Sequence, residues 1–338
     1  MGIAVLGILM ALAAGKVVHR VQFWHLDPNP ALVWSAPFGS RPQDVGIAKG
    51  LDGQRYGPLA FVHAEHRFWI ADSYQHRIVE TGKTWRTVAV PDAVIEDLVY
   101  ASRGLYFVDN QQLAVYRLLG GRVSKIIQLT VPPGQTEAIW HLAADGRNLV
   151  LEGVRLGRGQ SEMWVAKYSA QGRLLGVINM ARSQWDSPLQ VDDAYPISAV
   201  VRSFEAGPHG WLYVEAASGD RYQREVLVYD RQDRLLRKMP VLSPEPIVHS
   251  EFLGINRLGW IYMGINLTVP GHSLVVMVTP SGRTTTLKVR TVPVKSVVYG
   301  TVGSTGSLYL LQSTHAEYRI VRWNLRPATR WVWRGPHW

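Results

Sequence analysis

The stretch that decides the fold is WLYVEAASGDRYQREVLVYDRQDRLL, residues 211–236. It holds a short strand with an aromatic centre, Leu212 to Val214, and a second apolar strand, Glu225 to Tyr229. A turn ending in Asp233-Arg234 then leads to a further strand. Short runs of β-branched and aromatic residues bounded by Gly, Asp and Ser are typical of antiparallel strands joined by tight turns. The stretch therefore predicts one small antiparallel sheet.

The aromatic strand recurs along the chain. Its counterparts are Phe68-Trp69-Ile70, Leu105-Tyr106-Phe107, Ile261-Tyr262-Met263 and Leu308-Tyr309-Leu310, with Leu149-Val150-Leu151 as a copy that lacks the aromatic ring. The central residues of the six copies are 37, 44, 63, 49 and 47 residues apart, a mean of 48. A repeat of this length is the period of a propeller blade.

The other strands of each copy recur in the same order. An apolar strand precedes the aromatic one at Leu59 to His63, Leu98 to Ala101, Ala138 to Leu142, Ala199 to Phe204, Phe252 to Ile255 and Val297 to Thr301. A third strand follows at Arg77 to Glu80, Leu113 to Leu118, Met163 to Tyr168, Glu225 to Tyr229, Leu274 to Val278 and Tyr318 to Trp323. The turn before the fourth strand ends in Gly82-Lys83, Gly121-Arg122, Gly172-Arg173, Asp233-Arg234, Gly282-Arg283 and Thr329-Arg330.

Gly and Asp tolerate the positive φ of a tight hairpin, which explains their place in these turns. The sequence thus predicts an all-β fold, a six-bladed β-propeller of four-stranded blades. Blade 3 is the least regular, because Glu152 to Ser161 interrupts it. Two strands compete to close the ring, Leu32 to Ala36 from the N-terminal side and Arg330 to Arg334 from the C-terminal side. The recurrence of the turn favours the second, with the N-terminal strand alongside.

Blade 1 contains Trp69-Ile70-Ala71-Asp72-Ser73-Tyr74-Gln75-His76-Arg77-Ile78-Val79. This run resembles the NHL repeat, whose core is Val/Ile-Ala-Asp-x-x-Asn-x-Arg-Ile, with Gln75 and His76 in place of the residues the family often has. The segments from Val228 to Leu236 and from Lys167 to Leu175 are similar to the family's outer hairpin. The full motif appears once. The resemblance covers residues 31–335 and implies a propeller that acts as a binding module, while a minority of similar propellers are gluconolactonase-like or related enzymes.

Composition excludes several classes of protein. The chain has 338 residues, 47% of them hydrophobic and 18% charged, which is the balance of a globular protein. It has no cysteine, so disulfides, thiolate metal sites and cysteine nucleophiles are excluded. The formal net charge of +10 favours anionic surroundings.

The first residues predict export. Gly2 to Gly15 carry no charge and form an apolar run before Lys16, predicted as a helix, too short for a comfortable bilayer span but suited to a secretory signal. The small residues Ala11 and Ala13 fit a cleavage site, whereas an uncleaved anchor would include Val17 to Trp24. A buried first helix is the third alternative. Residues 1–30 are therefore assigned as signal peptide or membrane anchor with a short linker, and residues 31–338 as the propeller, placed outside the cytoplasm.

Three carboxylates lie near the starts of inner strands of different blades. Asp97, Glu137 and Glu251 are expected at the mouth of the central channel and are the predicted ligand-binding residues. If they converge, their oxygens suit a Ca²⁺ ion, the one cofactor that the sequence suggests. The second hypothesis for function is accordingly a Ca²⁺-dependent, gluconolactonase-like hydrolase or lyase at the channel. No Ser-His-Asp arrangement, P-loop or dinucleotide motif is present, so the sequence assigns no catalytic residue.

The turn residues form the other predicted surface. Lys83, Arg122, Arg173, Arg234, Arg283 and Arg330 would make a basic ring on one face of the propeller. Such residues commonly protect strand edges, and the functional alternative is contact with an anionic membrane or wall polymer. The opposite face, here called the long-loop face, is expected to carry the long segments Arg155 to Glu162, Arg182 to Pro196, Ala216 to Gln223, Asn266 to His272 and Gln312 to Glu317. The long-loop face is expected to bind a protein, peptide or glycan, and export makes nucleic acid a poor partner. The first hypothesis for function is therefore an exported or tethered binding and scaffold module.

Overall fold

The computed structural model describes most of residues 17–334. Residues 28, 51–52, 83, 91–92, 103, 132, 145–147, 158–159, 180–200, 208–209, 218–219, 233 and 268–270 are outside the description, as are residues 1–16 and 335–338. The chain divides into two compact units, one of residues 31–322 and one of residues 1–30 with 323–338. Because residues 1–16 are outside the description, the predicted signal sequence at Gly2 to Gly15 lies outside the described residues.

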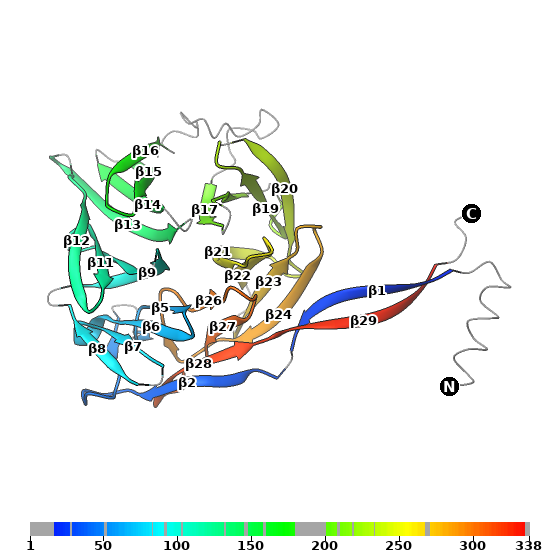
Figure 1. The fold of residues 1–338 in the computed structure, drawn as a ribbon, viewed down its shortest axis with the longest axis horizontal. Coiled ribbons are helices and arrows are strands. Elements are labelled where there is room, and N and C mark those ends of the chain that lie inside the picture. Colours follow the sequence, from blue (N-terminus) through cyan, green and yellow to red (C-terminus); the bar gives the residue numbers. More distant parts are fainter. Residues whose placement is uncertain are drawn as a thin grey trace. The chain divides into compact units, whose positions relative to one another are not determined.

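The larger unit is all-β and has the architecture of a β-propeller (Figure 1). Five four-stranded antiparallel sheets follow one another along its described residues, each a meander of consecutive strands. The first is β5 (Ala60–Ala64), β6 (Arg67–Asp72), β7 (Arg77–Glu80) and β8 (Arg86–Ala89). The second is β9 (Ile95–Ala101), β10 (Gly104–Asp109), β11 (Ala114–Leu119) and β12 (Arg122–Gln128). The third is β13 (Gln135–Ala144), β14 (Asn148–Gly157), β15 (Gln160–Ser169) and β16 (Leu174–Asn179).

The remaining sheets complete this unit. The fourth is β17 (Val201–Ala206), β18 (Leu212–Ala217), β19 (Gln223–Tyr229) and β20 (Leu235–Leu242). The fifth is β21 (Ile247–Ile255), β22 (Ile261–Leu267), β23 (His272–Val278) and β24 (Thr284–Arg290). The sixth joins β26 (Gly300–Val302), β27 (Leu308–Leu311) and β28 (Glu317–Trp323) to β2 (Ala31–Pro37). A small three-stranded sheet of β3 (Ala48–Lys49), β4 (Arg55–Tyr56) and β25 (Val294–Lys295) and a short 3₁₀ turn, η1 (Ser73–Gln75), are also present.

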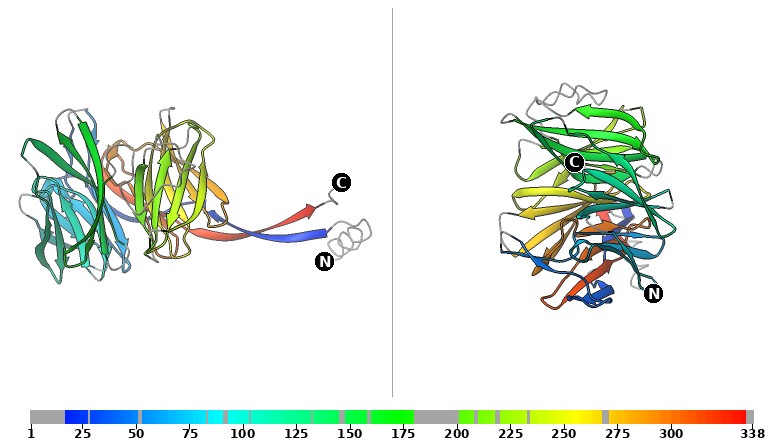
Figure 2. Two further views of the ribbon diagram at one scale, coloured as in Figure 1. Left: turned by 90° about the horizontal axis from the view of Figure 1, so that it is seen from above. Right: turned by 90° about the vertical axis from the view of Figure 1, so that its left-hand side faces the viewer.

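The innermost strands β5, β9, β13, β17, β21 and β26 contact one another in cyclic order, so the sheets surround a common centre (Figures 1 and 2). One face of each sheet packs against a face of the next sheet. Tyr213 and Val228 of the fourth sheet, for example, share a buried core with Ile261 and Val276 of the fifth. Burial of these apolar faces is the main stabilising term of the fold.

The tyrosines of the aromatic strands are explained by their position in the core. Tyr106, Tyr213 and Tyr262 are fully buried. The Tyr262 hydroxyl donates a hydrogen bond of 2.8 Å to the carbonyl of Gly306, in a turn of the next sheet. A buried ring whose hydroxyl is bonded contributes packing without leaving a polar group unpaired. The repeat therefore marks the interface between sheets.

The recurring turn is stabilised by a side-chain oxygen at the end of the third strand. Ser169, Asp230 and Thr279 accept the backbone N–H of Arg173, Arg234 and Arg283, at 3.2, 3.0 and 3.1 Å. Gly121, Gly172 and Gly282 have positive φ, as expected for these turns, whereas Gly82 does not. The common geometry of three turns explains the pattern in the sequence.

Gly172→Ala is expected to lower the free energy of unfolding by about 2 kcal/mol, because Gly172 has φ +85° and an added Cβ would overlap the carbonyl oxygen of Ile126. Gly176→Ala is the matched control, since Gly176 lies in the following strand with no atom within 4 Å of the position that a Cβ would take. It is expected to stabilise the chain by about 0.5 kcal/mol. Urea unfolding of both variants measures the difference, and equal stabilities would contradict the turn geometry.

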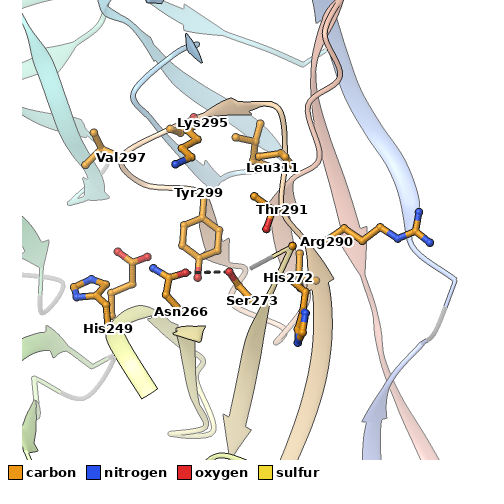
Figure 3. Close-up of a pocket in the computed structure, with 15 residues that line it drawn as sticks. His249, Asn266, His272, Ser273, Arg290, Thr291, Lys295, Val297, Tyr299 and Leu311 are labelled. Atoms are coloured by element: carbon orange, nitrogen blue, oxygen red, sulfur yellow. Dashed lines mark hydrogen bonds between the residues drawn. The ribbon is translucent and has the colours of Figure 1, made fainter. Parts of the chain in front are cut away.

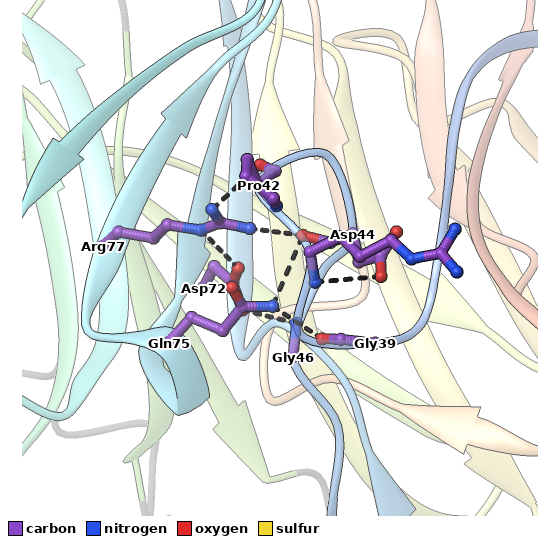
Figure 4. A network of polar contacts seen from close by, with 8 residues as sticks. Gly39, Pro42, Asp44, Gly46, Asp72, Gln75 and Arg77 are labelled. Carbon is purple, nitrogen blue, oxygen red and sulfur yellow. Dashed lines mark hydrogen bonds and ion pairs between the residues drawn. The ribbon is translucent and has the colours of Figure 1, made fainter.

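The motif of blade 1 fixes an N-terminal segment (Figure 4). Asp72 accepts the backbone N–H of Gly46 at 2.8 Å and the Nε of Arg77 at 2.9 Å. Arg77 also donates to the carbonyls of Pro42 and Asp44, and Gln75 donates to that of Gly39 at 2.8 Å. These motif residues hold the chain between β2 and β3 against the first sheet.

Three expectations from the sequence need correction. The strand that completes the last sheet is β2, paired with β28, and the favoured C-terminal candidate, Arg330 to Arg334, pairs instead with β1 (Val17–Leu26) as part of β29 (Leu325–Arg334). Val17 to Trp24 is strand, not part of an anchoring helix. Blade 3 is not interrupted at Glu152 to Ser161, because β14 and β15 pair along their whole length.

The smaller unit is the two-stranded antiparallel sheet of β1 and β29, in register from Val17 with Arg334 to Leu26 with Leu325. Asp27 and Arg326 form an ion pair of 2.6 Å in this unit. The described residues from Trp323 to Arg334 group with this unit. No helix among the described residues has the length and hydrophobicity required to cross a bilayer.

Candidate functional site

The three predicted channel carboxylates have different surroundings. Asp97, on β9, is buried and accepts hydrogen bonds from His141 Nδ1 and the Leu142 backbone, both at 2.8 Å. Glu137, on β13, is buried against Arg155 at 3.0 Å. Glu251, on β21, has no hydrogen-bond partner among the described residues and lines a pocket. Asp97 and Glu251 are close enough to affect each other's charge and belong to one cluster of charged groups. Glu137 forms a separate ion pair with Arg155.

His141 is the centre of that cluster. Its Nδ1 lies 2.8 Å from Asp97, and its Nε2 lies 3.7 Å from Glu205 on β17. Burial acts to lower the pKa of His141, but the two carboxylates outweigh it and raise the pKa well above its usual range. We therefore assign His141 as an imidazolium between two carboxylates of neighbouring sheets.

Two further carboxyls of the cluster titrate near neutrality. Burial, reinforced by Glu215, raises the pKa of Glu152 to about 7, with His141 opposing the rise. Burial also raises the pKa of Glu251 to about 7, where Glu215 and Asp97 add to the effect and His141 again opposes it. Glu215 is itself fully buried, accepts a hydrogen bond from Ser250, and lies 3.5 Å from Arg224 Nε. The centre of the propeller is a network of charged groups from the innermost and second strands of neighbouring sheets.

The cluster does not have the arrangement of a cation site. Among the residues that the structure describes, no three His, Asp or Glu side chains come together in a way that would hold a metal ion. The strongest interactions of Asp97 and Glu215 are with His141, Ser250 and Arg224. Donors that already occupy a carboxylate compete with a metal for its oxygens.

Stability is expected to fall as the pH rises from 5 to 8. The folded-state pKa values of Glu152 and Glu251 exceed the ordinary 4.5, so the folded chain holds more protons than the unfolded chain between pH 4.5 and 7, and the free energy of unfolding decreases over that interval. His141 acts in the same direction, because the stability from its raised pKa is complete below pH 6.5 and is lost above it.

Glu152→Gln should remove part of this dependence, since glutamine is neutral throughout. The variant is expected to equal the parent at pH 5 and to be more stable at pH 8 by on the order of 2 kcal/mol. Glu65→Gln, at an exposed turn, is the control and should change stability by less than about 0.5 kcal/mol at either pH. Urea titrations at the two pH values measure this, and a parent that is more stable at pH 8 would contradict it.

A pocket of about 610 Å³ lies between the fifth sheet and the segment that leads into β26 (Figure 3). It is at the end of the sheet where β22 and β24 finish and β21 and β23 begin, the side of the predicted long segment from Asn266 to His272. Cavities of this size hold small ligands or short polymer segments.

Four polar groups of the pocket are uncommitted. The Lys295 ammonium, the Glu251 carboxyl and the Asn266 amide nitrogen have no hydrogen-bond or ion-pair partner among the described residues. The hydroxyl of Tyr299 is buried and also unpaired there. Gly264 makes room for it, because a Cβ at that position would overlap the Tyr299 hydroxyl oxygen. The Tyr299 hydroxyl is buried, Lys295 and Glu251 are half-buried, and Asn266 is exposed. Buried polar groups normally find partners, so the Tyr299 hydroxyl together with these three lining groups indicates a ligand site.

Other lining residues are already engaged. Ser273 donates to the Asn266 side-chain oxygen at 3.0 Å, and His272 lies 3.2 Å from Glu245. Ser296 donates to the Pro58 carbonyl. These bonds fix the walls of the pocket.

The predicted basic ring is present only in part. Arg122, Arg173, Arg234 and Arg283 are exposed at the turns between third and fourth strands. Arg234 is paired with Asp230 at 2.7 Å. Lys83 lies outside the described residues, and Arg330 is in β29, opposite Val21, rather than at such a turn. The structure therefore corrects the ring at Arg330.

The expectations from the sequence did not include His141 or the carboxylates of the second strands. Asp72 and Asp109 end their second strands, Glu152 and Glu215 lie within theirs, and all four are buried. The signal was present, because each follows an apolar core such as Leu-Tyr-Phe-Val-Asp109 or Leu-Tyr-Val-Glu215. A carboxylate that recurs after a buried strand indicates a role in the interior.

Comparisons with known proteins do not assign the chain to a family. No family model matches the chain, and no curated protein matches it. Similar solved structures include TolB from Acinetobacter baumannii, with 15% identity, TM-score 0.44 and coverage of 78% of this chain and 63% of that one. AztD from Citrobacter koseri has 8% identity, TM-score 0.42 and coverage of 95% and 100%. A gluconolactonase from Xanthomonas campestris has 16% identity, TM-score 0.38 and coverage of 75% and 88%. With TM-scores below 0.5, these similarities do not define a family or function.

Proposed function

We propose that this chain is a six-bladed β-propeller binding module that takes a polar ligand in the pocket beside β21 and β25. The observation that supports this is the set of four uncommitted polar groups there, Lys295, Glu251, Asn266 and Tyr299. By contrast, Asp97, Glu215 and His141 at the centre are bonded to one another or to neighbouring groups. Polar groups that face a cavity without a partner in the protein are suited to bind a ligand there.

The wider setting follows the expectations from the sequence. We propose export or membrane tethering by the apolar run before Val17, with the ligand on a protein, peptide or cell-envelope polymer. The basic turn residues Arg122, Arg173 and Arg283 support contact with an anionic surface, because they are exposed cations on one end of the sheets. The resemblance of blade 1 to NHL repeats fits a binding role.

A thermal-shift panel of short peptides and oligosaccharides tests the proposal. Ser273→Trp, which fills the pocket, is expected to abolish any ligand-induced shift, while Ser281→Trp, at the opposite end of the same sheet, is expected to keep it. Binding that persists in Ser273→Trp would contradict the site. Ca²⁺-dependent turnover of lactones that is lost in Glu251→Gln would instead favour the enzyme.

A further inference from the structure

The charge of the pocket comes mainly from Lys295. Strand β25 holds this residue in place, because its carbonyl accepts the Gly57 N–H at 3.0 Å and Val294 pairs with Arg55 in the small sheet. The side chain is half-buried, and its ammonium points into the pocket above Tyr299 (Figure 3). An unpaired, partly desolvated ammonium on a fixed strand favours an anionic group.

Two other groups of the pocket, Glu251 and Asn266, are suited to hydrogen-bond the hydroxyl groups of a ligand. Asn266 lies near the hydroxyl end of the Tyr299 ring, away from Lys295 (Figure 3), and Glu251 also lines the pocket. A carboxyl can accept hydrogen bonds, and the free amide nitrogen of Asn266 can donate them. The raised pKa of Glu251, about 7, lessens its repulsion of an anion in the same pocket. Acceptor and donor side by side match a hydroxyl, which does both.

The wall of the pocket also has apolar residues. Val289, Val292, Val297 and Leu311 contribute them, together with the ring of Tyr299. One aromatic ring beside polar groups offers a surface for the C–H face of a sugar ring. A peptide that binds by adding a strand to a sheet would instead require an open strand edge, whereas this pocket is built from strand ends and connections.

We propose that the pocket binds an acidic oligosaccharide through a hexuronate unit, and this proposal rests on the proposed binding function. The carboxylate of the hexuronate pairs with Lys295, and its hydroxyls form hydrogen bonds with Asn266 and Glu251. The cavity volume of about 610 Å³ leaves space for a neighbouring sugar. Arg290, exposed and directed away from Tyr299 in Figure 3, is not part of this contact.

Titration calorimetry of the full chain with a glucuronate-containing disaccharide, and with the neutral disaccharide that has CH₂OH in place of the carboxylate, tests the proposal. The acidic sugar is expected to bind about tenfold or more tightly than the neutral one, the gain of one charge-assisted hydrogen bond. Lys295→Met is expected to remove this preference. Asn266→Ala is expected to weaken both.

Lys288→Met is the matched control. It removes the same charge from the exposed face of β24, outside the pocket, and is expected to keep the preference. Melting curves check that each variant is folded. Three results would overturn the hexuronate proposal and leave the proposed binding function intact. They are equal affinities for the two sugars, a preference that survives Lys295→Met, and binding of a peptide carboxylate in place of either sugar. Failure of every ligand in the thermal-shift panel would overturn both.

Discussion

His141→Leu is expected to lower the free energy of unfolding at pH 7 by about 3–5 kcal/mol. Asp97 is 5% exposed and the Glu205 side chain 16% exposed, so loss of the imidazolium leaves two carboxylates without their cation in the interior. Glu152 and Glu251 carry further negative charge nearby as they ionise. Leucine fills a similar volume, so the loss is electrostatic rather than a cavity effect.

A double-mutant cycle with Asp97→Asn separates the interaction from general damage. The double variant is expected to be more stable than the sum of the two single losses predicts, by about 1–3 kcal/mol. Urea unfolding measures all four proteins. A loss below about 1 kcal/mol for His141→Leu, or additive losses, would show that the ion pair contributes little.

Deletion of residues 1–37 is expected to abolish cooperative folding of the propeller. The deletion removes β2, whose Ala36 is buried and whose Trp34 packs on Tyr318 at 6.2 Å between ring centroids. Without it, β28 becomes an open edge strand and the last sheet loses one wall of the core it shares with Phe61 and Ile70. The loss of a whole strand exceeds the usual stability of a domain.

Deletion of residues 1–26 is the control, because it removes β1 and keeps β2. This shorter deletion is expected to leave a cooperative transition. Circular dichroism on heating distinguishes the two chains. A folded chain without residues 1–37, with the transition of the parent, would mean that β2 is dispensable.

Most of the strands could be predicted from the sequence. The aromatic strands around Tyr106, Tyr213 and Tyr262 lie in β10, β18 and β22, because a residue buried between two sheets must recur wherever the sheet recurs. The turns could be predicted for the same reason, since the positive φ of Gly121 or Gly172 leaves few alternatives. These features depend on local pattern.

Pairing between distant strands could not be predicted in this way. Thr329-Arg330 resembles the turn of the other copies, yet its strand pairs with β1, because the partner of an edge strand depends on the whole chain. The residues of the candidate site could not be predicted for the same reason. Lys295 and Asn266 lie in segments with no distinctive motif, and only the ring of sheets brings them to one pocket with Glu251. Glu137, which was expected with Asp97 and Glu251 at the mouth of the central channel, forms an ion pair with Arg155 on the adjacent strand.

An engineered disulfide tests most directly whether β2 completes the ring of sheets that forms the pocket. The chain has no cysteine, and Ser35 of β2 lies opposite Arg319 of β28, so Ser35→Cys with Arg319→Cys introduces a single pair at backbone partners. Mass spectrometry under mild oxidation is expected to show an intramolecular disulfide in the folded monomer. A pair that stays reduced, while cysteines placed at residues 319 and 332 join instead, would contradict closure by β2.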